Sequence, residues 1–333
     1  MTDPAATIII VNFNAGAKLA KCLEHLERQS RRDFSVTVID NASSDASLDA
    51  ARRSPLQPEV IEAGANLGFA AGNNRAAETA QGEWLVFLNP DAYAAPDWFE
   101  KLMAGAARYP WADAFGSTQI DAGDPSRLDG AGDVLHVLGI PYRGGFGWPA
   151  SSIPPDGECF APCAAAAMYR RVVFEKLGGF DERFFCYGED VDLGFRLRLS
   201  GGRAVQLAEA RVFHEGSGIT GRHSDFTVYH GNRNRIWMLY KDMPGELYWP
   251  LAPLRLAADL YLLLRSFTVG IGPAYWRALV DGYGGLSKFR QSRRALQKGR
   301  RISWRALAGM LTWSPVKVSR RAVSLRAIEV EPV

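Results

Sequence analysis

The feature that most constrains the fold of this chain is a regular alternation of strand-like and helix-like segments over residues 7–92. Residues 7–11, 36–39 and 84–88 are short apolar runs typical of strands buried on both faces, and residues 60–61 predict a weaker strand. A helical stripe separates the first two runs: Leu19, Cys22, Leu23 and Leu26. Strands and helices alternating at this spacing predict right-handed crossovers, a mostly parallel sheet and therefore an α/β fold.

Composition limits the class of protein. The 333 residues are 47% hydrophobic and 23% charged, which supplies a large core and excludes a mainly disordered or fibrous chain. The polar start passes almost directly into the first strand, with no signal peptide, so we expect a cytoplasmic protein. The four cysteines are too few for a disulfide scaffold. Cys159 and Cys163 lack a second cysteine pair or a matching histidine for zinc, so we expect reduced core thiols.

Charge is distributed unevenly along the chain. From Leu286 onward there are twelve Lys or Arg residues but only two acids, Glu329 and Glu331, whereas the rest of the chain is mildly acidic. Such an asymmetry indicates an anionic partner, either a membrane surface or a nucleic acid. Because the chain carries no signature of a nucleic-acid-binding module, we favour the membrane surface and expect no nucleic acid partner.

Residues 247–285 are rich in leucine and aromatic residues. Arg255, Asp259 and Arg265 interrupt this stretch, so no segment reaches the roughly 20 uncharged apolar residues that span a bilayer. The pattern predicts either an interfacial helix, with the basic tail near anionic headgroups, or a helical pair packed on the body; the two interpretations are compatible.

Polar side chains gather where three of the predicted strands end. In a parallel sheet, ligands bind beyond the carboxyl ends of the strands, and folding brings these ends to one rim. We therefore predict a binding site formed by the polar residues at these ends: Asn12, Asn14, Asp40, Asn41, Asn89 and Asp91. Asp91, directly after a buried strand, is suited to hold a hard divalent cation that also binds a diphosphate.

A second acidic group, Glu189, Asp190 and Asp192, opens a predicted helix. Successive helical residues are about 100° apart, so Asp190 and Asp192 point in different directions. One can face a cleft while the other pairs with Arg196 or Arg198 on the outside. A carboxylate in a partly dry cleft has a raised pKa and can act as a general base, although acids in a first turn also suit the helix dipole. Because Glu189 and Asp190 lie at the helix start, we favour one of them over Asp192 as the general base.

Two further features complete the candidate site. The glycine-rich turn from Asn66 to Asn74 enters a helix and suits an anionic ligand, but it is neither GxGxxG nor a Walker motif, which disfavours NAD and P-loop readings. His214 follows a predicted strand and precedes Glu215-Gly216-Ser217-Gly218. A single histidine after a strand is more often structural than a metal ligand. An acidic metal site elsewhere in the chain makes the role of metal ligand more plausible for His214.

Together these motifs resemble the inverting family 2 glycosyltransferases of GT-A fold, in particular their bacterial rhamnosyltransferase-like branch. The resemblance covers about residues 7–240 and leaves 241–333 as a helical, basic extension. Its residues also include Asp129-Gly130-Ala131-Gly132 and Gly178-Gly179-Phe180-Asp181-Glu182. The family's usual DxD is here Asn89-Pro90-Asp91, a departure typical of this branch that puts strict metal dependence in doubt.

The resemblance implies a role for each site residue. Asp40 would bond the nucleotide base, and the end of the first strand, Asn12 and Phe13, would line the base pocket, with Asn66, Gly68, Asn73 and Asn89 completing the nucleotide-sugar site. Asp91 and His214 would bind Mg²⁺ or Mn²⁺. Asp190, beside Glu189, would be the catalytic base.

The implied reaction is a single in-line displacement that inverts the anomeric carbon. The donor would be a nucleotide diphosphate sugar, with dTDP-L-rhamnose as the first choice. The acceptor would lie beside the loops of residues 129–160 and would be a glycan or a polyprenyl-diphosphate-linked glycan of cell-envelope polysaccharide biosynthesis, at the cytoplasmic face of the inner membrane. The alternatives are a UDP-sugar donor carrying galactofuranose, a hexose or an N-acetylhexosamine, or a non-catalytic nucleotide- or glycan-binding module.

Overall fold

The computed structural model describes residues 3–216 and 224–328. Ser217 and Gly218, which follow the predicted ligand His214, lie outside the described residues. The strands are β1 Ala6–Asn12, β2 Phe34–Asp40, β3 Glu59–Glu62, β4 Trp84–Leu88, β5 Ala92–Ala94, β6 Ala114–Asp121, β7 Leu128–Gly130, β8 Asp133–Leu135, β9 Pro141–Arg143, β10 Gly157–Glu158, β11 Ala166–Arg170, β12 Ala204–His214 and β13 Arg326–Ala327. The helices are α1 Ala17–Glu27, α2 Ser47–Arg53, α3 Gly68–Ala77, α4 Trp98–Arg108, α5 Arg171–Leu177, α6 Glu189–Leu199, α7 Asp225–Asp242, α8 Gly245–Tyr248, α9 Ala252–Thr268, α10 Gly272–Gly284, α11 Arg290–Gly299, α12 Trp304–Ala308 and α13 Pro315–Ser319.

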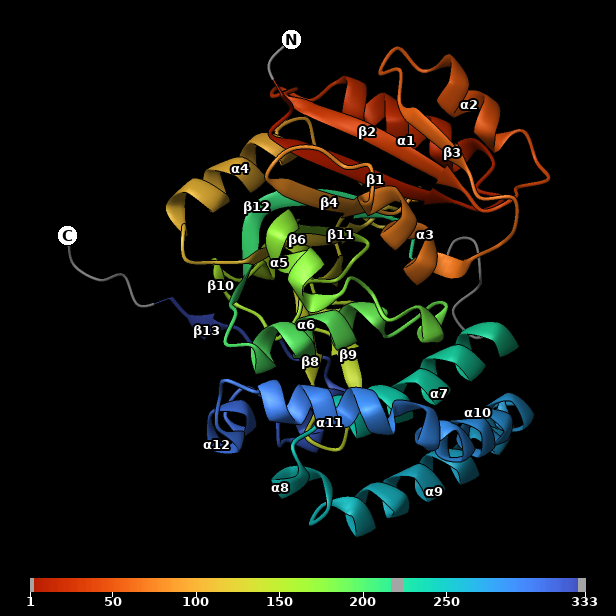
Figure 1. Ribbon diagram of the computed structural model, residues 1–333, viewed down its shortest axis with the longest axis vertical. Helices are drawn as coiled ribbons and strands as arrows, with labels where there is room; N and C mark the ends of the chain where they lie inside the picture. The colour runs from red at the N-terminus through yellow and green to blue at the C-terminus, as the bar shows by residue number, and fades with distance from the viewer. Residues whose placement is uncertain (1–2, 217–223, 329–333) are drawn as a thin grey trace.

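A single mixed sheet organises the N-terminal part of the chain (Figure 1). Its order is β13-β10-β12-β6-β11-β4-β1-β2-β3, and β5 and β7 pair with β12 and β6. The four strands predicted from residues 7–92 are mutually parallel neighbours, whereas β11 runs antiparallel between β4 and β6. The α/β prediction is confirmed.

Apolar cores lie on both faces of this sheet. One core joins the sheet to α1 and α4, and it contains the predicted stripe of α1: Leu19, Cys22, Leu23 and Leu26. The other joins it to α3, α5 and α6. Burial on both faces explains why β1 and β4 read as continuous apolar runs, since each of their residues is buried.

The C-terminal helices form a further layer below α6, at the end of the molecule away from β1–β3 (Figure 1). They share an apolar core with α6 and α7 to which Phe289, Leu307 and Leu311 contribute buried side chains. The chain then returns to the sheet, where β13 pairs antiparallel with β10. The basic segment after Leu286, which we expected to lie against headgroups as a tail, is therefore built into the fold.

Candidate active site

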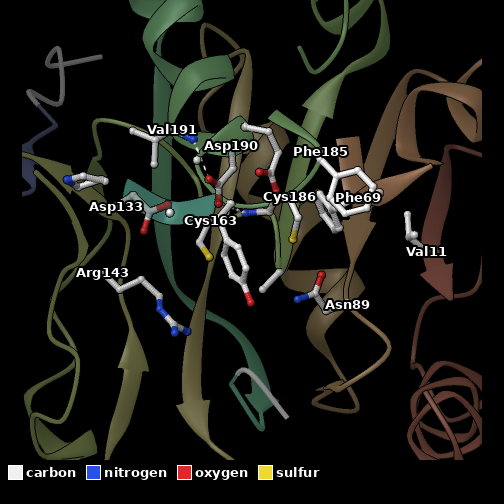
Figure 2. A pocket seen from close by; sticks show the side chains of 18 of the residues that line it. Val11, Phe69, Asn89, Asp133, Arg143, Cys163, Phe185, Cys186, Asp190 and Val191 are labelled. Carbon is white, nitrogen blue, oxygen red and sulfur yellow. Dashed lines mark hydrogen bonds between the residues drawn. The ribbon is translucent and has the colours of Figure 1, made fainter. Parts of the chain in front are cut away.

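A cavity of about 690 Å³ opens at the carboxyl ends of β1 and β4 and at the start of α6 (Figure 2). Its walls come from segments far apart in the sequence, because the parallel strands end at the same edge. Most of the predicted site residues line it: Phe13, Asn66, Gly68, Asn89, Asp91, Glu189, Asp190 and His214.

Of the remaining predicted residues, Asn41 also lines the cavity, and Asn14 is exposed next to Phe13 in the sequence. Asn12, Asp40 and Asn73 lie behind the cavity wall. Asn12 Nδ2 donates to Asp40 Oδ1 at 2.7 Å, and the other carboxylate oxygen of Asp40 accepts from the backbone N–H of Ser43 at 2.9 Å. Asn73 is buried within α3 and donates to the carbonyl of Phe69. These side chains hold the loops that form the wall, and nucleotide contact by Asn12, Asp40 or Asn73 stays a prediction.

Asp91 and His214 meet on one side of the cavity. Antiparallel pairing of β5 with β12 sets His214 opposite Ala92, the residue after Asp91. His214 Nε2 lies 3.4 Å from Asp91 Oδ1 and makes no hydrogen bond with any described residue. His214 Nδ1 lies 2.7 Å from Asp129 Oδ2. A histidine whose far nitrogen is held by a carboxylate is the usual arrangement of a metal-ligating imidazole.

The electrostatics of this pair suit a divalent cation. Burial raises the pKa of Asp91, but the contact with His214 and the positive charge of Lys18 outweigh burial and leave the pKa below its ordinary value. Asp91 is therefore ionised at neutral pH. One carboxylate and one imidazole nitrogen are donors that Mn²⁺ or Mg²⁺ accepts, so the residues present fit the implied metal.

Asp190 points into the cavity from the first turn of α6 (Figure 2). Its Oδ1 accepts from the N–H of Val191 at 2.8 Å, and its Oδ2 accepts from the N–H of Ala164 at 3.2 Å. Burial raises the pKa of Asp190, and burial together with the neighbouring charge of Asp190 raises the pKa of Glu189 well above its ordinary value. The pKa of Glu189 is raised further than that of Asp190, so Asp190 is the acid of the pair that ionises more readily.

Asp192 lies away from the cavity, as its helical angle predicts. Its carboxylate pairs with Arg196 Nε at 2.8 Å and with Lys241 of α7. We expected such a pair on the outside of the helix, and this was wrong, because Asp192 is completely buried. Helix α7 packs on that side of α6, so the ion pairs of Asp192 join the two helices.

The loop that leads into α6 has an unusual backbone. Phe185, Tyr187 and Gly188 have φ angles of 66°, 70° and 84°, in the left-handed region that non-glycine residues seldom adopt. Asn234 of α7 holds this loop: its Nδ2 lies 2.9, 2.8 and 2.7 Å from the carbonyls of Phe184, Cys186 and Tyr187. The sequence gives no signal for this role of Asn234, because an asparagine inside a helix has no preferred distant partner.

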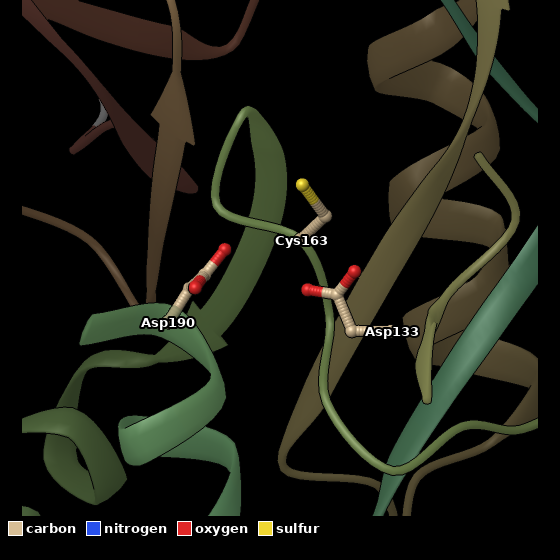
Figure 3. A group of neighbouring side chains, drawn as sticks. All are labelled: Asp133, Cys163 and Asp190. Carbon is tan, nitrogen blue, oxygen red and sulfur yellow. The ribbon is translucent and has the colours of Figure 1, made fainter. Parts of the chain in front are cut away.

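Asp133, Cys163 and Asp190 form a second group of close side chains (Figure 3). Their potential ligand atoms lie within 4.8 Å of one another. Burial and the charge of Asp190 raise the pKa of Asp133, and burial followed by the charges of Asp133 and Asp190 raises that of the Cys163 thiol. A thiol suits a hard cation poorly, so Asp91 and His214 remain the better pair for Mn²⁺ or Mg²⁺.

The structure places several further residues at the cavity that the sequence patterns did not indicate. Asp133 directly follows the motif of residues 129–132, which was a usable signal. Cys163 and Cys186 line the cavity and are only partly buried, so the expectation of core thiols holds for Cys22 and Cys159 alone. Arg143 lines the cavity and forms an ion pair with Asp129, a contact that sequence spacing does not reveal.

The mixed sheet, the flanking helices and the acid-lined cavity at the strand ends define a GT-A glycosyltransferase. The chain belongs to glycosyl transferase family 2, whose model matches residues 7–178. It is 30% identical over 294 residues to an N-acetylglucosaminyl-diphospho-decaprenol L-rhamnosyltransferase of Mycobacterium tuberculosis, covering 80% of this chain and 92% of that protein. It is also 32% identical over 227 residues to the O-antigen biosynthesis protein RfbC of Myxococcus xanthus, covering 63% of this chain and 17% of that protein.

Solved structures share the fold at low sequence identity. The mannosyltransferase PcManGT of Pyrobaculum calidifontis, solved with GDP-Man and Mn²⁺, gives a TM-score of 0.54 at 20% identity and covers 90% of this chain and 85% of its own. GalNAc-T7, solved with UDP, GalNAc and Mn²⁺, gives a TM-score of 0.58 at 16% identity, over 72% of this chain and 48% of that one. These likenesses confirm the predicted GT-A fold.

Proposed function

We propose that this enzyme transfers L-rhamnose from dTDP-L-rhamnose to a hydroxyl of a polyprenyl-diphosphate-linked N-acetylglucosamine during cell-surface polysaccharide biosynthesis. The observation that carries the proposal is the placement of Asp190 and of the Asp91–His214 pair in the wall of one cavity. The choice of sugar and acceptor is supported by the mycobacterial rhamnosyltransferase, which aligns with most of the chain.

In this reaction Asp190 is the general base. It takes the proton from the acceptor hydroxyl, whose oxygen attacks the anomeric carbon as the nucleotide diphosphate leaves on the opposite side. One base and no protein nucleophile give inversion, and the cavity wall aligns the two reactants. A divalent cation held by Asp91 and His214 would stabilise the negative charge on the leaving diphosphate.

The donor and the acceptor enter the cavity from different sides. Phe13, Asn66 and Gly68 lie on the side of β1 and α3, where we place the nucleotide, and Asn89 lies at the end of β4. The acceptor occupies the side formed by β8, β9 and the following loop. This arrangement sets the acceptor hydroxyl near Asp190.

We also propose that α9 and α10 contact an anionic membrane surface from the cytoplasm. None of the described helices is long and apolar enough to cross a membrane. α9, however, buries two charged side chains and exposes most of its apolar ones, although Leu263 is buried and Arg265 is exposed; an ordinary surface helix shows the opposite distribution. Arg255, Asp259 and Ser266 are 5%, 3% and 4% exposed, whereas the following apolar side chains of α9 are exposed: Leu254, Leu256, Leu260, Tyr261, Leu264 and Phe267.

Packing explains the inversion of α9. Asp259 Oδ1 accepts from Arg235 Nη2 of α7 at 2.5 Å, and Arg255 lies over the ring of Tyr248. The exposed apolar surface continues onto α10 through Trp276 and Val280. Large exposed apolar patches mark binding surfaces, and α11 nearby carries four basic residues and no acid. This combination favours a leaflet with anionic headgroups over a second, equally basic copy of the chain.

A donor panel tests the proposed reaction. The purified enzyme with Mn²⁺ or Mg²⁺ is offered a short-chain prenyl-diphosphate-linked N-acetylglucosamine and either dTDP-L-rhamnose or UDP sugars, and the product is identified by mass spectrometry. We expect rhamnosyl transfer with inverted configuration. Preferential transfer from a UDP sugar would favour the alternative donor, and donor binding without transfer from any donor would favour the non-catalytic module. Binding is measured by thermal shift, where ligand at a hundred times Kd adds about 2.7 kcal/mol of stability.

A further inference from the structure

The segment after α13 crosses the rim of the catalytic cavity before it joins the sheet as β13. The carbonyl of Arg321 accepts from the N–H of Gly145 at 2.6 Å, and the carbonyl of Ala322 accepts from the hydroxyl of Tyr142 at 3.1 Å. These bonds tie the C-terminal segment to β9 and to the loop that follows it. A residue more than 130 positions beyond Asp190 in the sequence therefore belongs to the cavity wall.

Arg321 presents a guanidinium at this rim. Its backbone has a φ angle of 51°, and the side chain lines the cavity with its guanidinium carbon 5.9 Å from the centre of the Tyr142 ring. Among the described residues it forms no ion pair with a carboxylate. The other arginines of the cavity wall are neutralised, because Arg143 pairs with Asp129 and Arg235 pairs with Asp259.

The neighbourhood of Arg321 favours a bound anion. Partial burial and the positive charge of Arg143 lower the pKa of Arg321 from its ordinary value. An arginine nevertheless remains charged at neutral pH, so the guanidinium of Arg321 is a cation of the cavity wall with no carboxylate partner among the described residues. Such a cation is stabilised by a bound anion, and the planar guanidinium matches the oxygens of a phosphate.

We propose that Arg321 binds the diphosphate of the lipid-linked acceptor. The inference rests on the proposed function, which places a diphosphate in each substrate. Arg321 enters from the side of β9, the acceptor side, whereas the nucleotide-binding candidates Phe13 and Asn66 lie on the side of β1 and α3. The C-terminal segment thereby selects acceptors that carry a diphosphate over neutral glycosides.

Steady-state kinetics test this assignment with three variants. Arg321→Gln removes the charge, Arg321→Lys retains it, and Arg320→Gln is the matched control, because Arg320 is exposed like Arg321 but lies outside the cavity lining. We expect Arg321→Gln to raise KM for prenyl-diphospho-N-acetylglucosamine about tenfold to a hundredfold, the usual loss for a hydrogen bond to a charged group. Arg321→Lys should recover part of this loss. KM for the sugar nucleotide, and turnover of a neutral alkyl N-acetylglucosaminide, should not change.

Two outcomes would overturn the assignment. A raised KM for the donor with an unchanged KM for the acceptor would mean that the guanidinium serves the nucleotide diphosphate. Equal behaviour of Arg321→Gln and Arg320→Gln would mean that it serves neither substrate.

A binding measurement separates this inference from the proposed reaction. Farnesyl diphosphate is titrated into the wild type and into Arg321→Gln, with farnesol as the uncharged control. Tighter binding of the diphosphate by the wild type alone supports the anion site even if no rhamnose is transferred. Equal binding by both proteins contradicts the site even if rhamnose is transferred.

Discussion

At the residue scale, backbone hydrogen bonds distinguish two neighbouring acids of the cavity. Glu189 and Asp190 are adjacent on α6, and burial raises the pKa of both. Only Asp190 receives backbone N–H donors on both carboxylate oxygens, from Ala164 and Val191, and such bonds favour the charged form. Local hydrogen bonding therefore favours Asp190 over Glu189 as the proposed base.

Asp190→Asn should retain nucleotide-sugar binding and lose turnover by about 10²- to 10⁴-fold, since a positioned base contributes that much. Substrate affinity is measured by titration and turnover by product formation, with the exposed Asp49→Asn on α2 as the control. The wild-type rate should fall as the pH drops through the raised pKa of Asp190, because the base must be deprotonated. This acid limb should lie above about 4, the ordinary value for aspartate. Turnover near that of the wild type in Asp190→Asn would reject the base.

At the element scale, the start of α6 is set by contacts with two other helices. α3 approaches from one side, where a Cβ on Gly68 would lie 2.5 Å from Phe185 and where its φ is 81°. α7 approaches from the other side with Asn234. The left-handed residues before α6 are strained, and strain of this kind persists where surrounding contacts impose it.

Asn234→Ala should lower the free energy of unfolding by about 2–3 kcal/mol, because it leaves buried carbonyls of the loop without their donor. It should also reduce kcat, since the loop fixes the direction of Asp190. Urea denaturation and steady-state kinetics measure the two effects. Asn232→Ala is the matched control on the same helix, where Nδ2 donates to the carbonyl of Val228 and to no other described residue. Equal losses in the two variants would contradict a specific role for Asn234.

At the scale of the whole molecule, the C-terminal region has three connected tasks. Its helices complete the core below α6, β13 closes one edge of the sheet, and α9 with α10 presents the exposed apolar surface. Removing the region after Leu286 would therefore take Phe289 and Leu307 out of this core, expose Phe184 and Trp237, which pack against Phe289, and disturb the fold. Surface substitutions are the cleaner test of membrane contact.

Replacing Leu256, Leu260 and Leu264 together by serine should weaken binding to phosphatidylglycerol vesicles by at least about tenfold. These side chains are 53%, 56% and 63% exposed and lie four residues apart on one face of α9, so the fold should tolerate the change. Cosedimentation measures binding, and Val172→Ser, which is 63% exposed on α5, is the control. Unchanged vesicle binding, or the loss of a dimer in its place, would contradict the lipid surface.

The sequence by itself determined the elements and the family. The β-branched runs of β1, β2 and β4 and the stripe of α1 are local patterns that report burial, and the polar ends of the strands marked the rim of the cavity. The motifs around Asp91, Asp190 and His214 carried the resemblance to family 2 glycosyltransferases, which the comparisons confirm.

Only the tertiary structure decided which distant side chains became partners. Asp129 meets His214, Asn234 holds the loop before α6, and Arg321 returns to the cavity, and none of these pairs has a local pattern. The orientation of α9 was also decided by the tertiary structure, because its sequence periodicity marks an apolar side but does not say whether that side faces the core or the solvent. The partners of Arg255 and Asp259 on other helices keep these two charges buried, and most leucines of α9 therefore face outward. A buried charge requires a partner, and where that partner lies is settled only when the chain has folded.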